Sequence, residues 1–168
     1  IDLSGKEINT GLVFNRLESN SSNHIYKIGG INLTVSDKMY NQAIISRINS
    51  TLQGVEFSDI TYKNNNSTVY TFFNFISSQV GSVKNVKFTN VNLIARYRDD
   101  VSLFGRLYSY DVDGIELNNV SIEGNSFVAA LLCTSEQTER HVRNIYADGL
   151  TINAHYNYSG GLFGNIPS

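Results

Sequence analysis

The sequence has little or none of several residue types whose abundance would indicate a particular class of protein. In 168 residues it contains one cysteine, one proline, one methionine and no tryptophan. The single cysteine, Cys133, excludes an internal disulfide framework and leaves the redox compartment open. No apolar run approaches the roughly 18 residues of a membrane-spanning helix, so we expect no membrane insertion. The formal net charge of −2 gives no basic footprint for nucleic acid.

The residues that are abundant favour short strands joined by tight corners. There are 21 asparagines, 13 glycines and 10 tyrosines, and 41% of the chain is hydrophobic. This composition suits a β-rich domain with a sizeable core. The chain starts at Ile1 with neither an initiator methionine nor a signal peptide. We therefore expect residues 1–168 to form a single domain that is a fragment of a larger protein.

Internal repetition is the strongest signal in the sequence. Apolar residues stand at offsets 0, 3, 5, 8 and 10 in four segments, and a weaker fifth copy has Gly30 at offset 5; successive copies are separated by 27 to 31 residues. The five segments begin at Ile25, Leu52, Val83, Val112 and Val142. A further apolar element precedes each copy, and a sixth such element follows the last copy; these elements lie at residues 13–17, 44–48, 72–76, 103–107, 128–132 and 162–166. The chain thus holds five full repeats and the opening of a sixth.

The spacing within each repeat predicts an all-β fold. Apolar residues two apart have strand periodicity, and the three-residue gap between the pairs indicates a corner. A unit this small cannot bury its apolar face alone, so the repeats must stack. Because parallel crossovers are right-handed in most proteins, we predict a right-handed parallel β-helix. It would have about five coils of 27–31 residues, with three short strands in each coil.

Columns of like residues across the coils support this prediction. Outward positions should place Glu56, Lys87 and Glu116 on successive coils about 4.8 Å apart, with alternating charge. Residues that tolerate a left-handed backbone recur at the expected corner, and asparagines stacked there can hydrogen-bond along the axis. This corner column is Asn32, Asp59, Asn90, Asn119 and Gly149.

Two short elements resemble a known repeat. The sequence G-L-F-G at residues 161–164 and L-F-G at residues 103–105, each near a V-x-N-V-x-I-like pair of strands, resemble the GLUG-motif repeat. The resemblance covers residues 11–168, although the elements at 13–17 and 44–48 lack the glycine. That repeat occurs in bacterial surface proteins, such as adhesin-like proteins and the non-catalytic N-terminal regions of immunoglobulin A1 protease-type zinc metallopeptidases. The resemblance implies an extracellular protein, secreted or attached to the cell wall.

The zinc motif of such proteases is not present in this chain. A zincin needs two histidines four residues apart on a helix, with a glutamate beside the first. The three histidines, His24, His141 and His155, have no such context. We therefore expect no metal site, no cofactor and no catalytic residues.

Aromatic and basic residues after the last strand of two repeats form the predicted binding site. Tyrosine beside arginine or histidine is a common platform for a sugar ring or a protein surface, whereas the alternative is packing over the edge of the core. The candidate residues are Arg96, Tyr97, Arg98, His155, Tyr156 and Tyr158.

A column of phenylalanines raises a second binding hypothesis. Phe73, Phe104 and Phe163 occupy the face of the third strand opposite to its other apolar residues. Only one face of a strand can point inward unless a bulge intervenes. Either glycines such as Gly105 supply a bulge that hides these rings, or the rings form an outward stripe that needs a partner.

Catalytic alternatives are less favoured by the sequence. The carboxylates Asp99 and Asp100, and likewise Asp111 and Asp113, are expected in loops between strands, as turn formers and solvated charge. Cys133 is expected to behave as a small hydrophobe, with a weak alternative as a nucleophile near His141. His141 ends an insertion, residues 134–141, that we expect to be a loop.

These features together predict a non-catalytic extracellular module with a structural or adhesive role. Its rigid repeat surface would bind a host protein, a neighbouring domain or a glycan. The alternative is a carbohydrate-binding module, or a fragment of a carbohydrate-active enzyme that uses one face of the β-helix.

Overall fold

The computed structural model describes residues 6–7, 14–17, 26–35, 41–48, 51–64, 72–79, 81–107, 111–134, 141–156 and 159–165. Within these ranges the regular structure consists of strands, and no helix is present. The strands are β1 (Lys6–Glu7), β2 (Phe14–Leu17), β3 (Tyr26–Val35), β4 (Asn41–Ile48), β5 (Leu52–Gln53), β6 (Val55–Asn64), β7 (Phe72–Gln79), β8 (Val83–Leu107), β9 (Asp111–Val128), β10 (Leu132–Thr134), β11 (His141–Asp148), β12 (Thr151–Ala154) and β13 (Phe163–Asn165).

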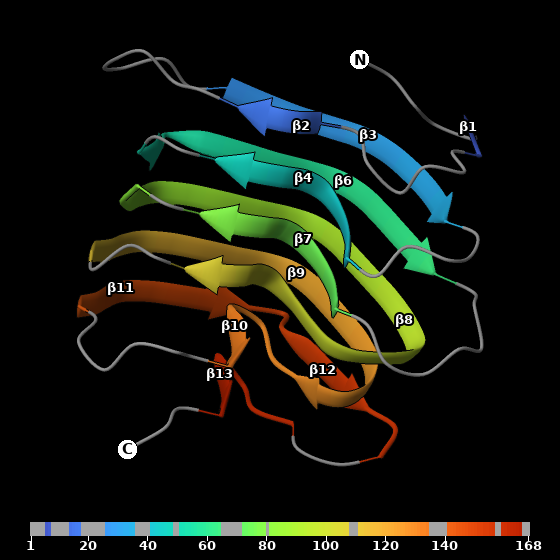
Figure 1. Ribbon diagram of the computed structural model, residues 1–168. Coiled ribbons are helices and arrows are strands. Elements are labelled where there is room, and N and C mark those ends of the chain that lie inside the picture. The colour runs from blue at the N-terminus through green and yellow to red at the C-terminus, as the bar shows by residue number, and fades with distance from the viewer. Residues whose placement is uncertain are drawn as a thin grey trace.

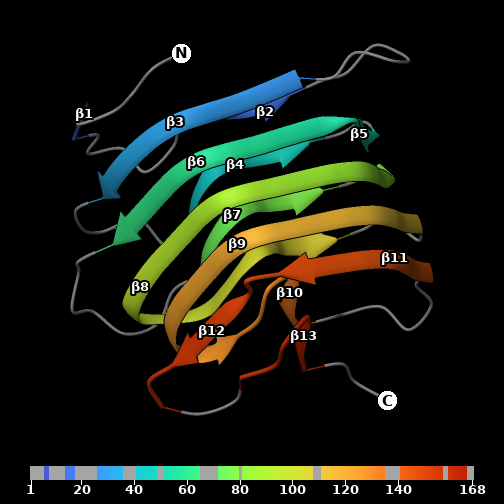
Figure 2. The ribbon, with the colours of Figure 1, turned by 180° about the vertical axis from the view of Figure 1, so that it is seen from behind.

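The strands are paired in parallel and curl into a half-barrel (Figure 1). On one side, β3, β6, β8, β9 and β11 follow one another as successive layers, as Figure 2 shows most directly. On the other side, β2, β4 and β7 continue into the C-terminal part of β8. Each layer is therefore hydrogen-bonded to the equivalent segment about one repeat further along the chain.

The predicted register is confirmed at the centre of the stack. Val86 pairs with Ile115, and Ile115 pairs with Ile145. Val86 and Ile115 are no more than 1% exposed. Ile145, in the last described layer of this side, is only partly buried. Each layer thus covers the apolar side chains of the next, as the repeat spacing requires.

The three short strands predicted for each repeat merge into longer bent strands. Residues 87–94 of β8 pair with β6, whereas residues 101–107 of the same strand pair with β7. One strand therefore belongs to both sides of the half-barrel. This corrects the expectation that Asp99, Asp100, Asp111 and Asp113 lie in loops, because β8 spans the first two and β9 begins with the other two.

A column of residues with positive φ forms the predicted corner. Asp59, Asn90 and Asn119 all have φ of 54°. The Asn119 side-chain amide donates to Asn90 Oδ1 at 2.9 Å, and the Asn90 amide donates to Asp59 Oδ1 at 2.8 Å. The predicted hydrogen bonds along the axis are therefore present. Asparagine and aspartate suit this corner because their short polar side chains tolerate the left-handed backbone.

The first repeat departs from the predicted alignment by two residues. Tyr26 pairs with Val55 and Ile31 pairs with Ile60, so the corner opposite Asp59 is Gly30, with φ of 68°, and not Asn32. Asn32 instead pairs with Thr61 in the outward polar column. Glycine meets the positive φ without steric cost, which explains why the corner lies there.

Two further columns of positive φ shape the bends of the half-barrel. One consists of Gly54, Asn85, Gly114 and Asn144, at the start of the layers β6, β8, β9 and β11. The other comprises Asp100, with φ of 52°, and Phe127, with φ of 51°, where β8 and β9 turn from one side to the other. Positive φ is uncommon for a bulky residue, so the backbone at Phe127 is strained.

The hypothesis that phenylalanines form an outward stripe is wrong for Phe73 and Phe104, because both residues are 0% exposed. The expected alignment of the two residues is also wrong: Phe73 pairs with Val101, and Phe104 pairs with Ile76. Residues 101–104 are buried in succession. The hydroxyl of the buried Ser102 is satisfied in this position, since Ser102 Oγ donates to the Phe104 carbonyl at 2.8 Å and the Asn74 amide donates to Ser102 Oγ at 3.0 Å.

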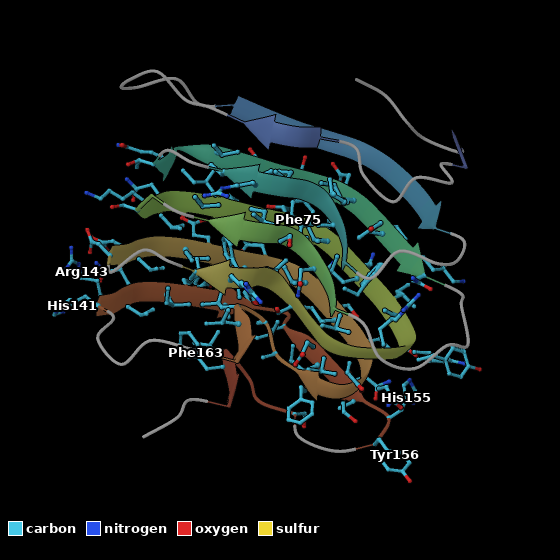
Figure 3. All side chains as sticks on the ribbon, in the orientation of Figure 1. Phe75, His141, Arg143, His155, Tyr156 and Phe163 are labelled. Atoms are coloured by element: carbon cyan, nitrogen blue, oxygen red, sulfur yellow. The ribbon has the colours of Figure 1, made fainter. Side chains whose placement is uncertain are left out.

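Aromatic rings fill much of the interior. Phe57 stacks on Phe88 with ring centroids 5.1 Å apart, and Phe75 meets Phe57 edge-on at 4.9 Å. Figure 3 shows Phe75 between the two sides of the half-barrel. Tyr62 stacks on Phe73 with centroids 4.3 Å apart. Side chains therefore fill the described core. A ligand would bind to the columns of outward-facing residues on the surface of the stack.

Candidate binding site

The predicted site lies where β8 and β9 leave the first side of the half-barrel. Ala95 pairs with Gly124, and Gly124 pairs with Ala154. Beyond β12, the backbone amide of His155 donates to the Gly124 carbonyl at 3.0 Å. Three consecutive layers thus bring the residues after Ala95, Gly124 and Ala154 to one edge of the molecule.

Glu123 joins two of the predicted residues at this edge. Arg96 Nε donates to Glu123 Oε1 at 2.7 Å, and His155 Nε2 lies 2.7 Å from the same oxygen. The Glu123 side chain is 19% exposed, whereas those of Arg96 and His155 are 63% and 36% exposed. A half-buried carboxylate therefore holds two more exposed nitrogen groups in place.

The charges at Glu123 shift its titration. The hydrogen bond from Arg96 is the largest influence and lowers the pKa of the Glu123 carboxyl, with His155 adding to the effect and partial burial opposing it. The same hydrogen bond raises the pKa of the Arg96 guanidinium. Both groups therefore remain charged over the neutral range.

Two exposed tyrosines lie beside this group. Tyr97 is 44% exposed and Tyr156 is 77% exposed. Figure 3 shows His155 and Tyr156 next to each other at the edge of the molecule, with the Tyr156 ring pointing away from the strands. We call the five residues Arg96, Tyr97, Glu123, His155 and Tyr156 the Glu123 patch.

Arg98 does not belong to the exposed site. It is 3% exposed, because the register between β8 and β9 shifts between Ala95 and Asp99, so that Arg96 and Tyr97 are both exposed and the next side chain turns inward. Its charge acts on the buried phenol of Tyr62: burial raises the pKa of that phenol well above its usual value, and Arg98 offsets part of the rise. The prediction that Arg98 binds a ligand at the surface is therefore corrected.

The remaining predicted residues are distributed differently. Tyr158 lies outside the described residues. Phe163 pairs with Leu132 at the C-terminal end of the stack and is partly buried against the core. Phe73 and Phe104 are core residues, as shown above, and cannot contact a ligand. Of the insertion, residues 135–140 also lie outside the described part, whereas His141 begins β11 and is exposed.

The aspartates of the enzyme alternative have contrasting surroundings. Burial, with a contribution from Asp99, raises the pKa of Asp100 to about 6. One of its oxygens, Oδ1, is buried and accepts no hydrogen bond within the described part of the chain. Asp99 Oδ1 accepts a hydrogen bond from the Asn125 amide at 3.0 Å. A partly buried carboxyl with a raised pKa beside a second carboxylate is an arrangement that also occurs in catalytic sites.

Asp111 and Asp113 are held in a network of cations. Arg143 approaches Asp111 at 3.1 Å and Asp113 at 2.9 Å, and Lys84 lies 3.6 Å from Asp111. The Asn144 amide donates to Asp113 at 2.7 Å and, together with Arg143, lowers the pKa of that carboxyl. These contacts join three layers and favour a structural role for both aspartates.

Sequence reasoning identified Arg96 and His155 but missed Glu123. Glu123 is 27 residues after Arg96 and 32 residues before His155, so it occupies the intervening layer. The repeat period could have identified Glu123. An outward residue that lies about one repeat after Arg96 and one repeat before His155 must stand between these two side chains in the stack.

Comparison with protein-family models, curated proteins and solved structures gave no match to this chain. In the residues that the structure describes, no three histidine, cysteine, aspartate or glutamate side chains are grouped so that they could hold a metal ion. The same part of the chain contains no helix of the length and apolarity needed to cross a membrane.

Proposed function

We propose that the chain is a non-catalytic structural and adhesive module of an extracellular bacterial protein. It would fold as a right-handed parallel β-helix and present a rigid surface to a host protein, a neighbouring domain or a glycan. The observation that carries the proposal is the parallel pairing that continues through five layers, from β3 through β6, β8 and β9 to β11. The resemblance of residues 11–168 to the GLUG-motif repeat agrees with it.

The mechanism of such a module is stacking. Each layer adds about 4.8 Å of length and one more member to every outward column. The ion pairs and amide hydrogen bonds between layers keep these columns in fixed positions. A partner that binds them therefore meets a surface that loses little conformational freedom on binding.

The Glu123 patch is the part of this surface that we assign to recognition. It combines two exposed tyrosines with an arginine and a histidine that Glu123 orients. Tyrosine and arginine are enriched where proteins bind partners, because both provide a large contact area together with a polar group. A host protein or a glycan would use the rings as platforms and the basic groups as hydrogen-bond donors.

Adhesion to defined surfaces tests this function. The chain, coupled to beads, is passed over wells coated with individual matrix proteins or glycans, and retention under flow is measured. We expect retention on at least one coating and a loss of about tenfold or more for Tyr97→Ala and Tyr156→Ala, as for interface hot spots. The matched control is Thr151→Ala, an exposed residue of β12 outside the patch. Equal retention of all variants would refute the role of the patch, and no retention on any coating would refute adhesion.

A carbohydrate-active enzyme is the second candidate, and the partly buried carboxyl of Asp100 beside Asp99 is the observation that favours it. A carboxyl with a raised pKa can act as a general acid near neutral pH. Incubation with a panel of polysaccharides, followed by a reducing-end assay, provides the test. Cleavage that is lost in Asp100→Asn and Asp99→Asn would establish this candidate, and the absence of cleavage in the unaltered chain would exclude it for that panel.

A further inference from the structure

A groove crosses the outer face of the half-barrel, away from the Glu123 patch. It has a volume of about 510 Å³ and extends over the four layers β6, β8, β9 and β11. Its lining includes Glu56, Lys87, Glu116 and Tyr146, which pair in this order in successive layers. The groove therefore runs along the stacking axis and across the strands.

The bends of the backbone create this groove. Its floor includes the positive-φ column Gly54, Asn85, Gly114 and Asn144, where each layer turns. A Cβ at Gly114 would lie 2.5 Å from Asn85 Oδ1, so the amide of Asn85 rests directly on the glycine below it. Glycine at this position leaves the groove open and accepts φ of 72°.

The edge of the groove is held in place by the cation network. The Asn144 amide is fixed by its bond to Asp113, which Arg143 also engages at 2.9 Å. Figure 3 shows Arg143 at the start of β11, beside this end of the layers. A groove whose polar groups are already oriented binds a ligand with a smaller entropic cost.

The charges in the groove disfavour polyanionic ligands. Lys87 Nζ lies 3.2 Å from Glu116 Oε2, and their side chains are 43% and 53% exposed. Glu56 adds a second carboxylate. Two carboxylates repel a polyanion such as nucleic acid, and the single lysine is already paired with one of them. The groove therefore favours a neutral ligand over a polyanion.

An added peptide strand is also disfavoured. Beneath the groove, β6, β8 and β9 pair on both sides with neighbouring layers and offer no free backbone edge. Within the described residues β11 pairs with β9 alone, so a strand could be added only beyond β11, at the end of the groove. Strand addition requires such an edge. Recognition must then use side chains: the ring of Tyr146, the amides of Asn85 and Asn144, and the charged pair.

We propose that this groove binds an extended, neutral oligosaccharide, with Tyr146 as the platform for one sugar ring. Tyr146 is 58% exposed. It continues the column of charged residues Glu56, Lys87 and Glu116 that lines the groove. An aromatic ring flanked by amide and carboxylate groups suits a sugar, which has an apolar ring face and a rim of hydroxyls. The inference rests on the proposed function of surface recognition, and adds a site and a class of ligand to it.

Titration followed by amide NMR tests the site directly. The isotope-labelled chain is titrated with neutral hexasaccharides of glucose, xylose, mannose and N-acetylglucosamine, up to about 10 mM to reach weak affinities. We expect saturable shifts at Gly114, Asn144 and Tyr146 for at least one sugar. Tyr146→Ala should weaken that binding by about tenfold, and Tyr146→Phe should retain it within about twofold. The control Thr151→Ala should match the unaltered chain.

Several results would overturn the proposal. These are the absence of saturable shifts with every hexasaccharide, shifts centred on Tyr97 and Tyr156 in place of the groove, or equal affinity of the Tyr146→Ala variant. Tighter binding of a charged oligogalacturonate than of the neutral sugars would overturn the charge argument. Retention on coated wells through the Glu123 patch is measured separately, so failure of the groove leaves the adhesion result intact.

Discussion

Replacing Asp100 with asparagine is expected to stabilise the protein at neutral pH. Asp100 is partly buried, its Oδ1 accepts no hydrogen bond within the described residues, and its neighbour Asp99 adds a repulsive charge. Ionisation is therefore more costly in the folded chain than in the unfolded one. Asparagine has the same shape, carries no charge and tolerates φ of 52° at this corner.

The magnitude follows from the pKa of Asp100, which rises from 3.8 to about 6 on folding. One pKa unit corresponds to about 1.4 kcal/mol, so full expression of the shift would destabilise the charged form by about 3 kcal/mol. Because the carboxyl retains contact with water, screening reduces the expected gain from Asp100→Asn to about 1–2 kcal/mol. For a chain of this length the melting temperature should rise by about 3–6 °C.

The dependence on pH distinguishes this cause from others. Between pH 3.8 and about 6, the folded state of the unaltered chain binds more protons at Asp100 than the unfolded state does. Its stability therefore falls as the pH rises through this window and stays low above it. The difference between Asp100→Asn and the unaltered chain should be largest at pH 7.5 and should disappear near pH 4.

Urea denaturation and calorimetry at pH 4, 5, 6 and 7.5 measure this difference. The matched control is Asp148→Asn, an exposed aspartate of β11 that should shift the midpoint little at any pH. An asparagine variant at position 100 that is no more stable than the parent at pH 7.5 would refute the reasoning. So would a stability difference that is independent of pH.

Three further substitutions test other features of the fold by the urea midpoint. Asn119→Ala should destabilise by about 1–2 kcal/mol, because alanine resists φ of 54° and ends the amide column, whereas Asn119→Gly should cost less. Gly105→Ala should cost about 1–3 kcal/mol, since the new methyl group would meet the Ser77 carbonyl oxygen at 2.8 Å, whereas Gly161→Ala, with nothing within 4 Å, should be neutral. In the parent, Glu123 stabilises the fold above about pH 4.5, and this stability is lost as the pH falls through the lowered pKa of Glu123. Glu123→Gln should lack this contribution. A parent whose stability does not change over this pH range would contradict the prediction.

The repeat period allowed most of the parallel register to be predicted from the sequence. Val86, Ile115 and Ile145 pair as expected, because apolar residues at a constant spacing can be buried together in only one alignment of the layers. The first repeat was misaligned because Gly30 and Asn32 are both suited to a corner. Composition alone does not distinguish such neighbours, whereas the pairing of Ile31 with Ile60 does.

The pattern of apolar residues in the sequence could not determine the burial and the alignment of the phenylalanine column. Phe73 and Phe104 occupy similar places in two apolar elements, yet the structure pairs Phe104 with Ile76. The alignment depends on Asn74 and Ser102, two buried polar residues that pair with each other and bond to the backbone. Buried polar side chains of this kind resemble surface residues in a sequence, and only their partners reveal their role.

The grouping of the candidate residues was predicted in part. Arg96, Tyr97, His155 and Tyr156 do gather at one edge, because their positions follow equivalent strands two layers apart. Arg98 was misplaced, since the bend after β8 residue Ala95 shifts the register before Asp99 and turns this side chain inward. Irregular segments break the simple alternation on which outward positions are assigned.

The nearest-neighbour arrangement of layers also has a mechanical consequence. Contacts run between adjacent layers, from β3 to β6, to β8, to β9 and to β11, and the layers at the two extremes do not depend on each other directly. Tension applied to the ends of such a stack would detach one layer at a time, beginning at an end of the stack. Each release of about 29 residues would lengthen the chain by roughly 100 Å, so the protein would yield under load in small steps and dissipate a sudden pull.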